Sequence, residues 1–513
     1  MCWLSQPPHD WWWIAPIALA PWVFTQWKES WLSGAASGLA LGTLQGVLEA
    51  SWMAGGLEQV GAPLAHAWLG TLVVALWGAG LPWMALGALL GASRWRPAGE
   101  RILLIAAGCF FVDALRSYAP GALPWGLLGH SQWNVPGVSQ IAVAGGVPLV
   151  SALLGAANAA IGALLACPGE WRSAAPRAGA LASAYGALAL AGLPVVEATR
   201  AADSWSSSSF NVLIVQPNIP ASERWVADLQ RTNLGFLAEQ TAQAVGNSLQ
   251  RPDLVVWPET VLTSPVDADE ALQRDLLEWA ARLGVPIVLG AARSSWSGDP
   301  RYYRNSALWV SPADGVIASF DKTRAIPLLE SVVRGPGGSA LEWLFGLPAS
   351  RRVVEEGAAN ESLRGPLSFA VALCFESIYP GLVGARRSAD TIAILNLAND
   401  SWFASDVPSK QQLAFASFRA IEQRLPLIRV AHGGVSGVVD PLGRVSHTLP
   451  FNARVHAQIE LRPSAPAGAI EKGLIVALPL ASGLGVWWAL TGLLHRKVRE
   501  LQAAEYARME ETR

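Results

Sequence analysis

The sequence predicts a multi-pass α-helical membrane bundle joined to an extracytoplasmic α/β domain. Long stretches without charge fill residues 1–197, whereas residues 210–462 alternate short β-type runs with amphipathic helical ones. A further observation is the overall charge. Only 15% of the 513 residues are charged, whereas soluble domains average about 25%. A large part of the chain is therefore suited to contact with lipid.

The first 197 residues contain about six segments that are long enough to cross a bilayer, and another lies near the carboxyl end. A bilayer core requires about 20 apolar residues of helix. Buried core helices of a soluble protein are the alternative, but several of these runs exceed the length of an ordinary core helix. The expected spans are 11–27, 33–52, 67–92, 101–118, 138–166, 178–196 and 473–494.

Arginine and lysine in the short connections predict the orientation of these spans. The basic connections are "SRWRPAGER", "PGEWRSAAPR" and "HRKVRE", whereas residues 53–66 and 119–137 contain no arginine or lysine. By the positive-inside rule, the basic connections are cytoplasmic. This places residues 197–472 outside the cytoplasm and makes residues 495–513 a cytoplasmic tail. The same count puts the amino terminus outside, from which we expect a further span before Met1.

Residues 210–462 are expected to form one α/β domain. Buried strands are indicated by "FNVLIVQPN", "DLVVWPET", "VPIVLGAA", "SALWV", "SFAVALCFES" and "TIAILNLAND". Between them, "DEALQRDLLEWAARLG" has helical spacing and ends at a glycine, which suits a helix terminus. Functional groups in such domains tend to lie at the carboxyl ends of strands. Three reactive or charged side chains occupy such positions, namely Glu259, Lys322 and Cys374.

These three side chains together have the composition of a cysteine acyl-transfer site. A thiol attacks an acyl carbon as a thiolate, so it requires a base for its proton and a positive charge near the developing oxyanion. Glu259 can supply the base and Lys322 the charge. Taken singly, each also has a structural interpretation: Cys374 as a buried filler, Glu259 as a helix-start carboxylate and Lys322 as a solvated turn residue. A pair of Cys374 with His432 is another possibility.

Other classes of site lack their residues. The chain has no G-x-S-x-G, no H-E-x-x-H, no P-loop and no G-x-G-x-x-G motif. Its four cysteines are scattered without the spacing of a disulfide framework or a zinc site. A net charge of −2 without a basic stripe argues against a nucleic-acid partner. We therefore expect no metal and no cofactor.

Several motifs together carry a resemblance to a known family. "WPET", "FDKTRAIPLLE", "CFES" and "NLANDSWF" occur in this order, with "ALPWGLLGHSQW" in the membrane half. They closely resemble the apolipoprotein N-acyltransferase family, a membrane-embedded branch of the nitrilase (carbon-nitrogen hydrolase) superfamily. The resemblance implies a nitrilase-like α-β-β-α sandwich at 210–462. It also implies a membrane bundle before this domain and one helix after it.

The resemblance assigns roles to four residues of the expected site. Cys374 would be the nucleophile, Glu259 the general base and Lys322 the cation that stabilises the oxyanion. Glu330 would orient the lysine or assist proton transfer. In "RAIPLLE", however, the family's usual glycine before Glu330 is replaced by Leu329. Because glycine permits backbone conformations that leucine resists, we expect the arm that holds Glu330 to be shaped differently here.

Further residues are expected beside this site. The resemblance implies that the Phe375 backbone N–H donates to the oxyanion and that Glu376 supports the loop. It also places Trp225 near the entry of lipid. Trp402 and Phe403 fall on a loop near the site, where they either line the lipid entry or pack the loop. The family's usual Asn-Asn-Gly is "HGG" here, beginning at His432.

The resemblance also implies a reaction and a location. An acyl chain would move from a phospholipid, phosphatidylethanolamine by resemblance, to Cys374 as a thioester. The α-amino group of the diacylglyceryl-cysteine at the amino terminus of an apolipoprotein would then receive it. The enzyme would be a multi-pass protein of the bacterial inner (plasma) membrane with its catalytic domain facing the periplasm. The alternatives are a membrane-tethered nitrilase-type amidase and a non-catalytic relative that binds lipid or lipoprotein.

Overall fold

A computed structural model of the chain describes residues 1–119, 121–167, 209–332, 338–347, 351–358, 361–403 and 405–462. The described residues form two compact units. The first contains residues 1–49 and 74–167, and the second contains residues 50–73 and 209–462. The expected spans 178–196 and 473–494 and the expected tail 495–513 lie outside the described residues.

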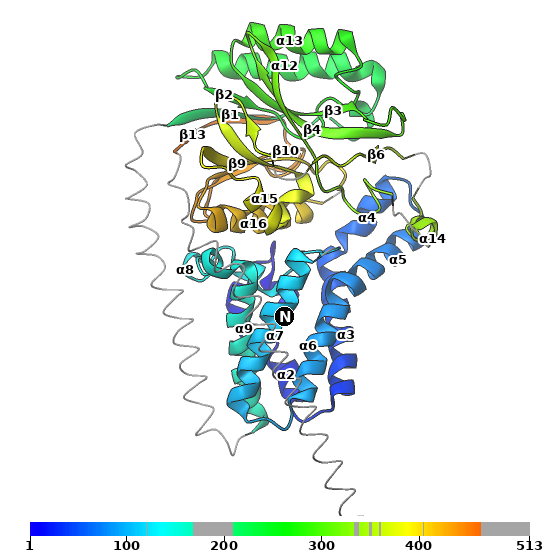
Figure 1. The fold of residues 1–513 in the computed structure, drawn as a ribbon, viewed down its shortest axis with the longest axis vertical. Coiled ribbons are helices and arrows are strands. Elements are labelled where there is room, and N and C mark those ends of the chain that lie inside the picture. Colours follow the sequence, from blue (N-terminus) through cyan, green and yellow to red (C-terminus); the bar gives the residue numbers. More distant parts are fainter. Residues whose placement is uncertain are drawn as a thin grey trace, which may run out of the picture. The chain divides into compact units, whose positions relative to one another are not determined.

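The amino-terminal part of the chain is helical (Figure 1). Two of its helices, Leu64–Ala92 and Ala142–Ala166, are long and apolar enough to cross a membrane. The first of these combines α5 and α6 through a π-helical segment at Leu76–Gly80. The helices are α1 (Cys2–Ser5), α2 (Ala20–Gln26), α3 (Trp31–Ala50), α4 (Trp52–Gln59), α5 (Leu64–Ala75), α6 (Leu81–Ala92), α7 (Ala98–Tyr118), α8 (Pro136–Ser139) and α9 (Ala142–Ala166).

Expectations for individual spans differ in outcome. The segments 33–52, 67–92 and 101–118 fall on helices α3, α5–α6 and α7. The segment 11–27 was wrong as one continuous helix, because only the seven residues of α2 are α-helical there. Pro16 and Pro21 explain the break, since proline lacks the N–H that an interior helical position must donate. Pro21 is tolerated in α2 because it lies in the first turn.

Helices α3 and α6 approach one another through glycine. A Cβ atom on Gly34 would lie 2.1 Å from the carbonyl oxygen of Gly87, and one on Gly38 would lie 2.2 Å from that of Trp83. Small residues at a spacing of four allow helix backbones to pack closely, an arrangement that is frequent between helices in membranes. The glycines of α3 therefore allow its backbone to pack closely against that of α6.

Two β-sheets form the centre of the second unit. The first sheet has the order β13-β1-β2-β3-β4-β5, with β6 paired to β4, and the second has the order β12-β11-β10-β9-β8-β7. The strands of the first sheet are β1 (Phe210–Gln216), β2 (Leu254–Val256), β3 (Ile287–Ser294), β4 (Tyr302–Ser311), β5 (Gly315–Asp321), β6 (Val353–Val354) and β13 (Val455–Leu461). Those of the second are β7 (Leu363–Arg364), β8 (Ser368–Leu373), β9 (Thr391–Asn399), β10 (Leu427–His432), β11 (Gly437–Val439) and β12 (Val445–Thr448).

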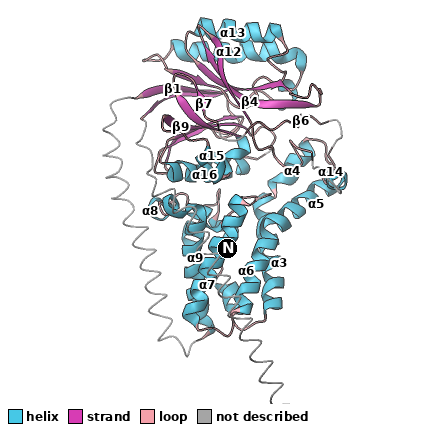
Figure 2. Ribbon diagram, in the orientation of Figure 1, coloured by secondary structure: helices cyan, strands magenta, loops and turns pink. Residues whose placement is uncertain are grey.

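The sheets pack face to face with helices on their outer faces (Figure 2). Between the sheets lies an apolar core to which Val256 and Trp309 of the first sheet and Phe369 and Leu395 of the second contribute. Side chains of α12 and α13 bury the outer face of the first sheet, and those of α16 cover the second. The α-β-β-α sandwich is therefore confirmed. Its helices are α11 (Ala221–Arg224), α12 (Gln230–Gly246), α13 (Glu270–Leu283), α14 (Gly338–Leu344), α15 (Pro380–Ala385) and α16 (Val407–Gln423).

The strand directions determine which residues can meet. Strands β1, β2 and β3 are parallel, as are β8, β9 and β10. Glu259 follows β2, Lys322 follows β5 and Cys374 follows β8. Because β5 runs antiparallel to β4, with Asp321 opposite Ser306, Lys322 emerges beside Asn305.

Candidate active site

Glu259 is held in a buried turn after β2. Its side chain is 4% exposed, and Oε1 accepts hydrogen bonds from Asn305 Nδ2 at 2.7 Å and from Lys322 Nζ at 3.1 Å. Gly290 of β3 passes directly under this turn, where a Cβ atom would lie 2.4 Å from the Glu259 Cα. Only glycine leaves room for that approach. The position of the carboxylate thus depends on a neighbouring strand as well as on its own.

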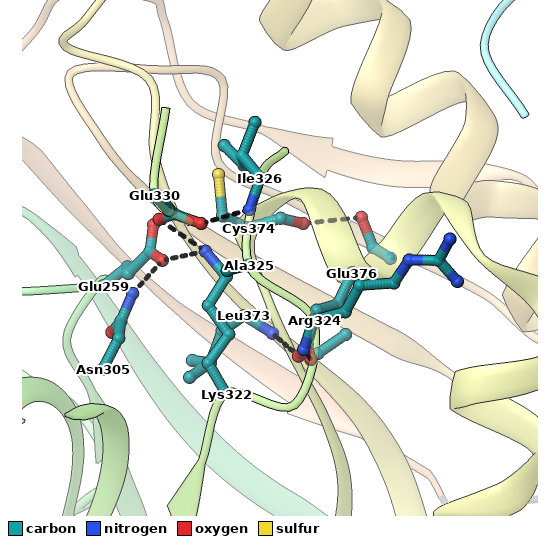
Figure 3. A network of polar contacts seen from close by, with 12 residues as sticks. Glu259, Asn305, Lys322, Arg324, Ala325, Ile326, Glu330, Leu373, Cys374 and Glu376 are labelled. Atoms are coloured by element: carbon teal, nitrogen blue, oxygen red, sulfur yellow. Dashed lines mark hydrogen bonds and ion pairs between the residues drawn. The ribbon is translucent and has the colours of Figure 1, made fainter. Parts of the chain in front are cut away.

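Lys322 lies between two carboxylates (Figure 3). Its side chain is fully buried, and Nζ donates to Glu330 Oε1 at 2.8 Å as well as to Glu259. The Lys322 backbone N–H donates to the Asn305 carbonyl at 2.7 Å, so Asn305 holds both the lysine and Glu259. A buried ammonium of this kind is stable only because its charge is compensated at short range.

Cys374 begins the turn that follows β8 and has an unusual backbone conformation. Its φ is +50°, a left-handed value that a residue with a Cβ adopts at a cost of about 1–3 kcal/mol. The strained turn is stabilised by Asn396, whose Nδ2 donates to the carbonyls of Ala372 at 2.8 Å and Cys374 at 3.2 Å. Such strain is typical of residues whose side chain must be presented to a reactant.

Glu376 connects the turn after β8 to the turn after β5. Its Oε2 accepts the Leu373 N–H at 2.9 Å, and Oε1 accepts the Thr323 N–H at 2.9 Å. Arg386 makes a two-pronged ion pair with the same carboxylate at 2.7 and 2.9 Å, and both side chains are fully buried. These bonds and the Arg386 charge hold the pKa of Glu376 below its usual value despite burial. Glu376 thus joins the two turns that carry Lys322 and Cys374.

The electrostatics distinguish the roles of the buried groups. Burial and the nearby Glu259 carboxylate raise the pKa of the Cys374 thiol well above its ordinary value. Burial raises the pKa of Glu259, and the adjacent Glu330 adds to this although Lys322 opposes it. Burial would lower the pKa of Lys322, but Glu259 and Glu330 reverse that effect and raise it. The site therefore contains a protonated thiol, a charged lysine and a carboxylate of raised proton affinity.

The arm that holds Glu330 still delivers this carboxylate to Lys322. Glu330 Oε2 also accepts the Ile326 N–H at 2.7 Å, which closes the arm on itself. Leu329 itself is not in the left-handed region, but the preceding residue Leu328 is, with a φ of +68°. The altered motif is therefore accommodated by placing a leucine in the left-handed region, at a cost of about 1–2 kcal/mol.

We expect Leu328→Val to lower the rate at which Cys374 reacts with an electrophile, because a β-branched residue tolerates positive φ less well than leucine and would displace Glu330. The arm should lose about 1–2 kcal/mol of stability. Leu328→Gly should be tolerated, since glycine adopts this conformation readily. The rate of labelling of Cys374 by a thiol-reactive probe measures the first effect, and thermal unfolding measures the second. Leu329→Val is the matched control, and equal losses in Leu328→Val and Leu329→Val would contradict the interpretation.

The aromatic residues expected near the site form contacts in two groups. Trp225 has its ring centroid 5.9 Å from that of Trp402 and 6.5 Å from that of Tyr303. Phe403 instead packs edge to face on Trp52 of α4 at 4.8 Å. All three of Trp225, Trp402 and Phe403 remain partly exposed. Their roles with lipid stay predictions, as does that of the Phe375 N–H, whose residue packs its ring on Tyr379 at 5.3 Å.

His432 does not pair with Cys374. It ends β10, two strands away from β8, and neither of its ring nitrogens has a hydrogen-bond partner in the part of the chain that the structure describes. The cysteine–histidine alternative therefore lacks its hydrogen bond. Sequence reasoning missed Asn305, Asn396 and Arg386. The two asparagines carried a signal, because each is a polar residue inside an apolar strand, whereas Arg386 carried none.

Two family models and several known proteins are similar to this chain. Residues 1–160 match the model of the apolipoprotein N-acyltransferase N-terminal domain, and residues 212–464 match the carbon-nitrogen hydrolase model. Among solved structures, a nitrilase-superfamily protein of Saccharomyces cerevisiae, Nit3, is similar at 15% identity and a TM-score of 0.39. That similarity covers 53% of this chain and 96% of that one.

Relatives named apolipoprotein N-acyltransferase are similar at higher identity. That of Brucella melitensis is 30% identical over 54% of this chain and 53% of its own length. That of Rhizobium meliloti is 28% identical over 86% and 82%. The chain thus aligns with about half the length of some of these relatives and with most of others. With that of Rhizobium rhizogenes, it is 31% identical over 72% of this chain and 68% of the relative. The chain belongs to the apolipoprotein N-acyltransferase family.

Proposed function

We propose that this protein is an apolipoprotein N-acyltransferase that acts through a thioester on Cys374. The observation that carries the proposal is the cluster of buried Glu259 and Lys322 and partly exposed Glu330 beside Cys374, in a chain that matches both domains of the family. A base with raised proton affinity next to a protonated thiol suits general-base activation of a nucleophile. The same groups serve both halves of an acyl exchange.

In the first half-reaction, Cys374 Sγ attacks the ester carbonyl carbon of a phospholipid while Glu259 takes the thiol proton. The charge on the tetrahedral oxyanion is stabilised by Lys322 and by the Phe375 N–H. The carbon–oxygen bond to the glycerol then breaks, and Glu259 returns the proton to the leaving oxygen. The products are a lysophospholipid and an acyl thioester on Cys374.

In the second half-reaction, the α-amino group of a diacylglyceryl-cysteine attacks the thioester carbon. Glu259 takes the proton of the amine, the carbon–sulfur bond breaks and the proton passes to Sγ. The product is an N-acylated lipoprotein with the free thiol restored. Glu330 holds Lys322 in place, and Glu376 holds the turn of Cys374, through both steps. Two products released in sequence imply ping-pong kinetics.

We also propose the membrane arrangement that this reaction needs. Residues 1–197 form a multi-pass bundle of about six spans, residues 210–462 the catalytic domain and residues 473–494 a last span before a cytoplasmic tail. The apolar helices Leu64–Ala92 and Ala142–Ala166 and the basic connections support this. The protein lies in the bacterial inner membrane with its catalytic domain in the periplasm. An ester donor held in a bilayer explains why a nitrilase-like domain carries spans at all.

Phosphatidylethanolamine is the donor that we propose on the basis of the family resemblance, with Trp225, Trp402 and Phe403 along the path of its acyl chain. Their partial exposure and the contact between Trp225 and Trp402 support this assignment. Large amphipathic rings of this type favour the boundary between lipid and water.

Growth rescue tests the function most directly. The chain is expressed in a bacterium depleted of its own apolipoprotein N-acyltransferase, and lipoprotein amino termini are analysed by mass spectrometry. We expect growth together with an added amide-linked acyl chain. Failure of rescue combined with ammonia release from small amides would identify an amidase instead. Failure of rescue with neither ammonia release nor a labelled thioester would identify a non-catalytic binding protein.

A further inference from the structure

Arg224, the last residue of α11, is a buried cation that makes no ion pair with any of the described residues. Its relative exposure is 0%, and Nη2 donates to the neutral oxygens Asn399 Oδ1 at 3.1 Å and Ser401 Oγ at 2.9 Å. Nε and Nη1 have no hydrogen-bond partner within the described ranges of the chain. Burial lowers its pKa to about 10, which still leaves it charged near pH 7. A buried guanidinium without an ion pair is costly, so its retention requires an explanation.

His432 provides a second unsatisfied group beside this cation. It is fully buried, and both of its ring nitrogens are without partners among the residues that the structure describes. Burial and the charge of Arg224 lower its pKa well below 6.5, so the ring is neutral and offers one N–H donor. Buried polar groups are normally hydrogen-bonded. Arg224 and His432 are two neighbouring exceptions to this rule, and Arg224 is charged. Together they could donate hydrogen bonds to an anion.

The chain beside these two groups is closely packed and supplies neutral side chains. Gly433 follows His432 with a φ of +69°, and a Cβ atom there would lie 3.0 Å from Asn218 Oδ1. Asp400, which directly follows Asn399 at the end of β9, is already paired with Arg429 Nη2 at 2.7 Å. Glu259 acts on Arg224 electrostatically, but among the described residues no carboxylate makes an ion pair with it, so a direct anionic partner would have to be a ligand.

The position of these donors relative to Cys374 fits a part of the donor lipid. Strands β8, β9 and β10 are adjacent and parallel, with His432 opposite Asn399 and Leu373 opposite Leu397. With neighbouring strands about 4.8 Å apart, the ends of β8 and β10 lie about 10 Å from each other across the sheet. Arg224 Nη2 donates to Asn399 at the end of β9, which is the strand between β8 and β10.

We propose that Arg224 and His432 bind the phosphodiester group of the acyl donor. The proposal rests on the proposed function, because a phospholipid ester at Cys374 carries its phosphate a glycerol backbone away from the reacting carbonyl. Arginine suits this role, since its planar fork donates two hydrogen bonds to phosphate oxygens. The imidazole N–H adds one neutral donor. Trp225, directly after Arg224, places an aromatic ring beside the same lipid.

The test supplies the purified full-length protein with two different acyl donors and compares the rates of acylation. One is a fluorescent phosphatidylethanolamine, and the other is a p-nitrophenyl ester of the same fatty acid, which has no phosphate. We expect Arg224→Gln to lower the preference for the phospholipid over the ester by about 10- to 100-fold. Arg224→Lys should lower it less, because it keeps the charge. His432→Leu should lower it by about 3- to 10-fold, and His432→Asn, which keeps an N–H donor, by less than His432→Leu.

Arg231→Gln is the matched control, since Arg231 is an exposed arginine paired with Asp275 on the surface of the same unit. It should leave the preference unchanged. An equal loss of both rates in Arg224→Gln and Arg224→Lys would show a structural role and overturn the proposal, as would a preference unchanged in every Arg224 and His432 variant. If the native protein accepts acyl chains from the ester but not from the phospholipid, the proposed function itself fails.

Competition distinguishes a lipid phosphate from phosphate in general. Glycerophosphoethanolamine, which contains the diester without acyl chains, and inorganic phosphate are each added to the acylation of the native protein by phosphatidylethanolamine. We expect glycerophosphoethanolamine to inhibit acylation at a lower concentration than inorganic phosphate does. This inhibition should be lost in Arg224→Gln. Competition by inorganic phosphate at an equal or lower concentration would overturn the assignment to the headgroup.

Discussion

Replacement of Cys374 by alanine is expected to lower acyl-enzyme formation from a fluorescent phospholipid by at least about 10³-fold. We assign the acyl chain to this thiol. In the described site, no other nucleophilic side chain lies close to both Glu259 and Lys322. The labelled band on a denaturing gel, chased with hydroxylamine, which cleaves thioesters, measures the effect. The fold should survive, because alanine removes one buried sulfur only.

Cys167→Ala serves as the control for this experiment. Cys167 is another free cysteine, partly exposed and outside the candidate site. Its substitution should leave the labelled band at native strength. A hydroxylamine-sensitive band that persists in Cys374→Ala but disappears in Cys167→Ala would show that the thioester forms on Cys167. That result would contradict our assignment of the nucleophile. A band of unchanged intensity in both variants would remove the thioester from the mechanism.

Replacement of Lys322 by methionine is expected to damage both stability and catalysis. Lys322 Nζ lies 3.1 Å from Glu259 and 2.8 Å from Glu330, in a place with no solvent access. Removing the cation leaves the buried Glu259 carboxylate without compensation beside the partly exposed Glu330, and breaking a buried ion pair typically costs about 3–5 kcal/mol. One carboxylate should then retain a proton near pH 7, because like charges cannot both ionise at this range. If Glu259 is the one protonated, it can no longer act as a base.

Chemical unfolding followed by tryptophan fluorescence and single-turnover acylation measure the two losses separately. Lys410→Met is the matched control, since Lys410 makes an exposed pair with Asp406. Exposed pairs of this kind contribute about 0–1 kcal/mol. A Lys322→Met protein that is as stable as Lys410→Met and retains acylation would show that the buried lysine is dispensable. A stable but inactive one would separate its chemistry from its structural role.

The sandwich could be predicted because its pattern is local. Strand-type runs between amphipathic segments predict an α/β domain, and the structure adds that side chains of two separate sheets share one core. The break at Pro16 and Pro21 could also have been foreseen from proline alone, although the apolar composition of residues 11–27 concealed it. The left-handed backbone at Leu328 could not have been foreseen. The sequence motif indicates a difference at Leu329 and does not say which neighbouring residue changes its backbone conformation.

The sequence by itself determined the class of the domain and the three strand-end residues Glu259, Lys322 and Cys374, because strand ends are visible in the pattern of apolar runs. Only the tertiary structure decided their partners. Asn305 and Arg386 belong to the site because antiparallel pairing and a buried ion pair bring distant segments together. The orphaned donors of Arg224 and His432 likewise exist only in three dimensions. Hydrogen-bond satisfaction depends on every neighbour in space, and a linear sequence does not list those neighbours.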